Sequence, residues 1–199
     1  MEISAHMKLL RWLSLAAILA SLPAGAQTKF EFWPGTSYDP AIPTYAKVFG
    51  HEPGERILSP ADLLKYLEAL AAASPRIRVF DYARSWEGRR LVYAVVASEA
   101  NIKRLDEIRA NMQRLADPRR TPEPEARQRM ASLPAVIWLG YGVHGNEISS
   151  PEAGLLTAYH LLAARKDKLV EEILSEVVVL IDPLQNPDGR ERFVHNFEQ

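Results

Sequence analysis

The chain has 199 residues, 47% of them hydrophobic and 25% charged, which is the composition of one globular domain or of part of a larger one. Its net charge of −1 gives no reason to expect nucleic acid or an anionic membrane as a partner. The absence of cysteine excludes disulfides and thiolate metal sites, so any metal must be held by His, Asp or Glu.

The first 26 residues show the three-part pattern of an export signal. Lys8 and Arg11 form a positive region, residues 12–22 form an apolar core, and Ala24-Gly25-Ala26 is a small-residue cleavage site. The apolar core is shorter than the roughly 20 residues of a membrane-spanning helix. We therefore predict cleavage after Ala26, giving a secreted or periplasmic protein with no membrane association; a buried N-terminal helix is the less favoured alternative.

Residues 27–57 are rich in aromatic residues and prolines, which predicts an irregular lead-in over the domain surface. The domain itself is predicted for residues 58–199. It opens with a helix, for which Ser59 is the expected N-cap and Pro60 the first helical residue. Apolar residues at helical spacing give this helix one buried face, and Pro75 follows its end.

Two strand-like runs, residues 77–82 and 91–97, come next, and the short segment between them predicts an antiparallel hairpin. Residues 101–116 have a helical pattern. The proline-rich and charged residues 117–129 predict a solvated loop with a short helical tail.

The remaining chain alternates between strands and helices. Residues 135–140 predict a strand, residues 150–165 and 168–175 predict helices, and residues 177–181 predict a strand that is apolar throughout. Such a run is typical of a strand buried on both faces, and strand–helix–strand order favours parallel pairing. The predicted fold class is α/β, with a mixed sheet whose parallel core strands are flanked by helices.

A histidine and a glutamate, His144 and Glu147, follow the strand of residues 135–140 directly. In open α/β sheets ligands bind outside the carboxyl ends of the strands. Imidazole nitrogen and carboxylate oxygen are ligands that a catalytic Zn²⁺ takes, usually with a third protein ligand and one position open to water. We therefore predict that both residues bind zinc; the alternative is a helix-capping Glu147 beside a surface histidine.

A second motif, Asn186-Pro187-Asp188-Gly189, follows the next strand and fits a type I turn. If the two strands are parallel, both motifs lie at the same edge of the sheet. Asn186, Asp188 and Arg190 are then candidates for a wall on the substrate side of the metal site. A turn with no chemistry of its own is the alternative.

The three ordered motifs together resemble the zinc carboxypeptidase family of the carboxypeptidase A and B type. The segment from Ser85 to Leu91, Ser-Trp-Glu-Gly-Arg-Arg-Leu, is similar to the family's Ser-x-Glu-Gly-Arg-x-Leu segment. His144 and Glu147 match two of the family's three zinc ligands. The resemblance runs from about Ser59 to Gln199, and it covers the N-terminal half of the family's domain, so it implies a truncated carboxypeptidase-like fold.

The resemblance implies a metallocarboxypeptidase, a zinc hydrolase that removes C-terminal residues from peptide or protein substrates. Its third zinc ligand, its carboxylate-binding residues and the glutamate that acts as general base are expected beyond Gln199. No catalytic residue is therefore assigned within the chain. The peptide source, whether protein or cell wall, stays open.

Two other functions are kept as alternatives. A deacylase of the aspartoacylase or succinylglutamate desuccinylase type also uses His-Gly-Asn-Glu, but the other motifs and the export signal favour the peptidase. The second alternative is a truncated, inactive product. Two ligands alone should bind zinc weakly, so the 199-residue chain should show no peptidase activity. Its sheet would end on an apolar edge at or near residues 177–182, which favours aggregation.

Other histidines and arginines are weaker candidates. We expect His51, His160 and His195 to be structural or to lie at the surface, because single histidines usually are. Arg190 and Arg192 could bind a substrate carboxylate in bidentate fashion, but a solvated role at a strand edge is favoured.

Overall fold

The computed structural model describes residues 31–197, and the predicted signal peptide lies outside this range. The chain divides into two units, Met1–Gly35 and Thr36–Gln199, and every helix and strand given below belongs to the second. Within residues 31–197, no helix is both long enough and apolar enough to cross a membrane.

The second unit is built around a four-stranded mixed sheet with the order β2-β3-β6-β4. Its strands are β2 (Ile77–Arg84), β3 (Arg90–Val96), β6 (Val177–Asp182) and β4 (Ala135–Gly140). β3 is antiparallel to both β2 and β6, whereas β4 is parallel to β6. The predicted hairpin, the predicted parallel pair and the predicted fold class are all confirmed.

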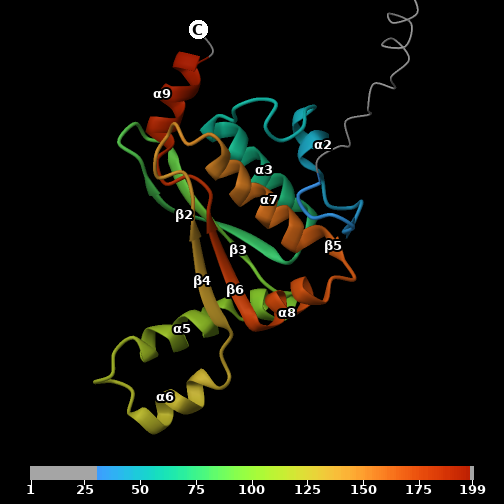
Figure 1. The fold of residues 1–199 in the computed structure, drawn as a ribbon. Helices are drawn as coiled ribbons and strands as arrows, with labels where there is room; N and C mark the ends of the chain where they lie inside the picture. Colours follow the sequence, from blue (N-terminus) through green and yellow to red (C-terminus); the bar gives the residue numbers. More distant parts are fainter. Residues whose placement is uncertain (1–30, 198–199) are drawn as a thin grey trace, which may run out of the picture. The chain divides into compact units, whose positions relative to one another are not determined.

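Helices cover both faces of this sheet. α3 (Pro60–Ala73) and α7 (Ser149–Ala163) lie side by side over one face and form the main core with it (Figure 1). α4 (Glu99–Lys103) and α5 (Leu105–Leu115) supply a smaller cluster, in which Ile102 and Ile108 pack with apolar residues of β3 and β6. The other elements are α6 (Glu123–Met130), β5 (Ala164–Arg165), α8 (Lys168–Glu176) and α9 (Pro187–Phe197).

The start of α3 is encoded locally, as the sequence predicts. The Ser59 hydroxyl accepts a hydrogen bond from the Asp62 N–H at 3.2 Å, and the Asp62 carboxylate accepts one from the Ser59 N–H. This reciprocal capping box satisfies two donors at the helix start. Leu63, Leu67 and Leu70 then bury one face of the helix.

The lead-in is more ordered than predicted. It contains β1 (Ser37–Tyr38), which pairs with β5, and the short helix α2 (Tyr45–Phe49). Ile42 and Tyr45 are buried in the main core, where the Tyr45 ring packs edge-on against Tyr66 of α3. Tyr45 therefore anchors the lead-in to the core.

One further prediction is corrected. The single helix predicted for residues 101–116 is interrupted at Arg104, whose backbone leaves the helical region at φ −110° and ψ 21°. The helical tail predicted for residues 117–129 is α6, a two-turn helix that extends to Met130 and is stabilised by two Glu–Arg pairs at i,i+4 spacing.

The apolar edge expected at or near residues 177–182 lies on the neighbouring strand and not on β6 itself, because β6 pairs on both sides, with β3 and β4. Within the described residues the edge next to it is β4. Val136, Ile137 and Trp138 of β4 are 39–50% exposed. The aggregation-prone edge therefore belongs to the strand that leads into the His144 loop.

Candidate metal centre

The loops that follow β4 and β6 run side by side, which is the arrangement that the sequence predicts for parallel strands. The pairing of β4 with β6 extends one residue past the Gly140–Asp182 pair, where the Tyr141 N–H donates to the Asp182 carbonyl at 2.9 Å. The N–H groups of Gln185 and Asn186 then donate back to the carbonyls of Tyr141 and Gly142, each at 3.0 Å. Both motifs therefore start from the same edge of the sheet.

His144 and Glu147 meet on the first of these loops. The His144 Nδ1 and Glu147 Oε1 atoms are 2.8 Å apart, and the two side chains are 71% and 49% exposed. A turn closes between them, because the Glu147 N–H donates to the His144 carbonyl at 3.2 Å. Gly142 permits the loop to leave the strand with a φ of +62°, where a side chain would be strained.

The capping alternative for Glu147 does not hold. α7 begins at Ser149 after Ile148, and no side chain caps this helix end. The Glu147 carboxylate instead faces the imidazole of His144.

The donor pair fits half of a zinc site. One imidazole nitrogen and one carboxylate oxygen converge, accessible to solvent, and both are ligand types that zinc takes in catalytic sites. Residues 31–197 contain no group of three His, Asp or Glu side chains placed to hold a metal ion together. The described part of the chain therefore offers two candidate ligands.

The second motif is the start of a helix rather than an isolated turn. Asn186 precedes Pro187, the first residue of α9, and its side-chain Oδ1 accepts from the Gly189 N–H at 2.9 Å. The Arg190 N–H donates to the Asn186 carbonyl at 3.1 Å, which is the first helical bond. A type I turn has nearly helical dihedrals, and Asn-Pro also fits an N-cap followed by the first helical position.

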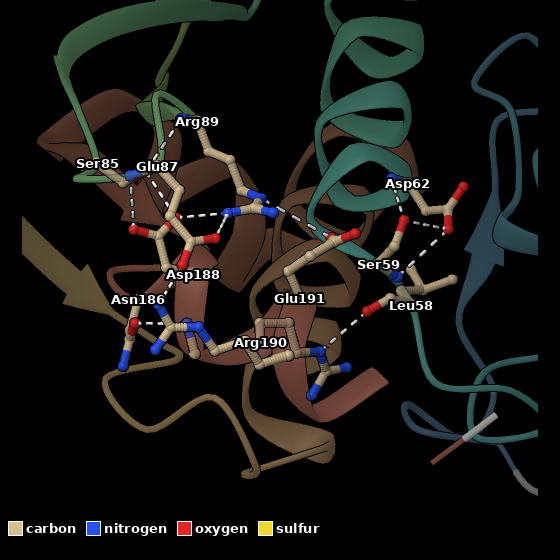
Figure 2. A network of polar contacts seen from close by, with 12 residues as sticks. Leu58, Ser59, Asp62, Ser85, Glu87, Arg89, Asn186, Asp188, Arg190 and Glu191 are labelled. Atoms are coloured by element: carbon tan, nitrogen blue, oxygen red, sulfur yellow. Dashed lines mark hydrogen bonds and ion pairs between the residues drawn. The ribbon is translucent and has the colours of Figure 1, made fainter. Parts of the chain in front are cut away.

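Asp188 ties α9 to the β2–β3 hairpin (Figure 2). Its carboxylate accepts from the Ser85 hydroxyl at 2.7 Å, from the Glu87 N–H at 3.1 Å and from the Arg89 guanidinium at 2.8 Å. Arg192, one turn further along α9, pairs with Glu87. The Ser-Trp-Glu-Gly-Arg and Asn-Pro-Asp-Gly motifs thus form one polar network.

An open hollow of about 520 Å³ lies beside this network. Asn186 and Asp188 line it together with Trp86, which projects fully exposed from the hairpin. The role of Asn186 and Asp188 in substrate binding stays a prediction.

Arg190 lies elsewhere than predicted. It belongs to a helix, and its side chain has no exposed surface, which contradicts the solvated strand-edge position. Its guanidinium donates to the Leu58 carbonyl (Figure 2). It also donates to carbonyls of the His144 loop. Burial lowers the pKa of Arg190, and the charge of Glu152 opposes this shift.

Glu152 is a buried residue near this site that the sequence-based reasoning missed. Burial raises the pKa of its carboxyl, against the opposing effects of a hydrogen bond from the Gly54 N–H and the charge of Arg190. A signal was present in the sequence, because Glu152 lies three and four residues before Leu155 and Leu156, on the buried face of the same helix.

The remaining histidines have structural surroundings. His160 is buried in α7, with its Nδ1 atom 3.1 Å from the Tyr38 hydroxyl. The His51 ring packs against Tyr45 and Phe49. His195 is exposed on α9.

Comparison with known proteins identifies the family. A model of the zinc carboxypeptidase family matches residues 63–196, a stretch that contains all three motifs. The chain belongs to the zinc carboxypeptidase family. A comparison with curated proteins gave no match.

Among solved structures, this zinc carboxypeptidase chain is similar to thrombin-activatable fibrinolysis inhibitor. The bovine protein, solved in complex with tick carboxypeptidase inhibitor, shares 15% identity over 69% of this chain and 33% of its own, with a TM-score of 0.43. A crystal structure of thrombin-activatable fibrinolysis inhibitor shares 16% identity over 77% and 30%, with a TM-score of 0.49. The chain therefore spans about a third of the length of these structures.

The contact between the two motifs predicts that Gly145→Ala is strongly destabilising. A Cβ atom at Gly145 would lie 2.1 Å from the Gly189 carbonyl carbon and 2.3 Å from the Arg190 nitrogen, so backbone must move. We expect a loss of about 1–3 kcal/mol in the free energy of unfolding, measured with denaturant. Gly154→Ala is the control, because its contact is with the Tyr141 side chain and helix propensity offsets the cost. Equal losses in both variants would contradict the close approach of the loops.

The Asp188 network predicts a pH-dependent stability. Burial raises the pKa of Asp188, but the bonds from Ser85, Arg89 and Glu87 outweigh it and hold the pKa below its ordinary 3.8. An acid with a depressed pKa stabilises the fold above its unfolded pKa and loses that effect as pH falls through the folded value. We expect Asp188→Asn to be less stable than wild type at neutral pH.

The difference should shrink as pH falls below 3.8, and it is measured by urea unfolding at neutral pH and at about pH 3. Asp106→Asn, at a side chain that is 90% exposed, is the control and should change stability little. A constant difference between wild type and Asp188→Asn at both pH values would show that the charge of Asp188 does not stabilise the network.

Proposed function

We propose that this chain forms the part of an exported zinc metallocarboxypeptidase that carries two of its metal ligands, His144 and Glu147. One observation carries the proposal: in a chain of the zinc carboxypeptidase family, the His144 Nδ1 and Glu147 Oε1 atoms meet 2.8 Å apart on an accessible loop at the end of a parallel strand. The substrate would be a peptide or protein with a free C-terminus. The export signal proposed for residues 1–26 supports action outside the cytoplasm.

The roles of the chain's own residues follow from their chemistry. Neutral His144 would hold the metal through its Nδ1 lone pair, and Glu147 would hold it through a carboxylate oxygen. When bound, Zn²⁺ polarises a carbonyl oxygen and lowers the pKa of its water ligand. Asn186 and Asp188, which line the neighbouring hollow, would bound the substrate on one side. The third ligand and the general base are proposed to follow residue 199, as the family resemblance implies.

Zinc binding tests the metal site. We expect zinc to shift the imidazole NMR signals of His144 in the wild-type chain, and Glu147→Gln to weaken that binding strongly because a charged ligand is lost. His144→Ala should abolish it, as judged by zinc content after dialysis. His195→Ala is the matched control, since this exposed histidine lies on α9. Undiminished zinc binding in either ligand variant would argue against the site.

Peptide hydrolysis tests the activity. The protein made from the gene's whole open reading frame is expected to release C-terminal residues one at a time from a free peptide, in a zinc-dependent manner. The same peptide with a C-terminal amide should be spared, because the reaction proposed requires a terminal carboxylate. Mass spectrometry of the products checks this result. Internal cleavage, or activity retained by Glu147→Gln, would contradict the proposal.

A further inference from the structure

The buried guanidinium of Arg190 contacts four backbone carbonyls. Its Nε atom donates to Leu58 at 2.9 Å, Nη1 donates to Glu147 at 3.3 Å and to Gly145 at 3.5 Å, and Nη2 donates to Ile148 at 3.3 Å. Three of these carbonyls belong to residues 145–148, the segment that holds Glu147. The side chain thus links α9 to the metal-ligand loop and to the segment that precedes α3.

Burying a full positive charge is costly unless partners compensate for it. Arg190 has no exposed surface, and the compensating acid is Glu152, which is 7% exposed on α7. Glu152 in turn accepts from the Gly54 N–H at 3.1 Å. The guanidinium is therefore surrounded by carbonyl acceptors, and the negative charge of Glu152 compensates for its positive charge.

The close approach of α9 makes these bonds possible. Gly145 lies against the backbone of Gly189 and Arg190 so tightly that it has no room for a Cβ atom. The Arg190 side chain therefore reaches Gly145, Glu147 and Ile148 from within the core. The exposed His144 and Glu147 side chains thus lie on a loop whose backbone is bonded by Arg190 from its inner side.

We infer that Arg190 is a positioning residue, which holds the backbone of residues 145–148 so that His144 and Glu147 converge on one metal ion. This role rests on the proposed function, because it assigns to Arg190 the geometry of the proposed zinc site. A lysine cannot replace it, because an ammonium is a compact point charge and lacks the planar fork that reaches several carbonyls at once.

The test uses Arg190→Lys, which keeps the charge opposite Glu152 and removes the fork. Zinc affinity is measured by titration with Zn²⁺ while following the His144 imidazole signals. We expect the zinc dissociation constant to rise on the order of 10–100-fold, the usual effect of losing a group that orients a metal ligand. Arg104→Lys is the control, because Arg104 also donates to a backbone carbonyl, that of Ser132, at 3.2 Å.

A second readout needs no metal. Hydrogen exchange of the Glu147 amide, which is bonded to the His144 carbonyl, should be faster in Arg190→Lys than in wild type or Arg104→Lys. If Arg190→Lys does not fold, the double variant Glu152→Gln with Arg190→Met removes both buried charges together, and it should show the same loss of zinc affinity.

The outcomes separate the two proposals. An unchanged zinc dissociation constant in a folded Arg190 variant would overturn the positioning role and leave the zinc site standing. A wild-type chain whose His144 signals ignore zinc would overturn the zinc site, and the inference about Arg190 with it. Weakened zinc binding together with faster Glu147 exchange would support the inference.

Discussion

The parallel pairing of β4 with β6 determines where every candidate functional residue lies. Its register runs from Ala135–Val177 to Gly140–Asp182, and three further backbone bonds continue it into the two loops. Because parallel strands end at the same edge, residues some forty positions apart in sequence become neighbours there. A shift of this register would separate the His144 loop from the start of α9.

Polar side chains then fix what the strands bring together. Asp188 links α9 to the hairpin at the surface, and Arg190 links the same helix to the His144 loop in the core. Asp188 and Arg190 are separated in sequence by Gly189, whose backbone contacts Gly145. The first turn of α9 thus connects the three motifs that this chain shares with the zinc carboxypeptidase family.

Much of this arrangement could be predicted from sequence because it is encoded locally. The capping box at Ser59, the apolar hairpin strands and the continuous apolar run of β6 each specify their element through neighbouring residues. The meeting of His144 with Glu147 also follows from a spacing of three residues in a tight loop.

What could not be predicted depends on contacts between distant segments. Arg190 is followed by charged residues and suggests a solvated position, yet the carbonyls it binds lie more than forty residues away. Tyr45 is buried because its ring packs against Tyr66 of α3. The proline-rich sequence around Tyr45 does not indicate this contact. Which strand forms the edge of the sheet likewise depends on which strand pairs with β3, and that pairing is determined by tertiary contacts.

The most direct test of the zinc site is to locate the ion. Crystals grown with Zn²⁺ would be measured at the zinc absorption edge, and the anomalous signal would be mapped onto the structure. The account predicts a peak within about 2.2 Å of both the His144 Nδ1 atom and a Glu147 carboxylate oxygen. Zinc bound elsewhere, with His144 and Glu147 still in direct contact, would contradict it.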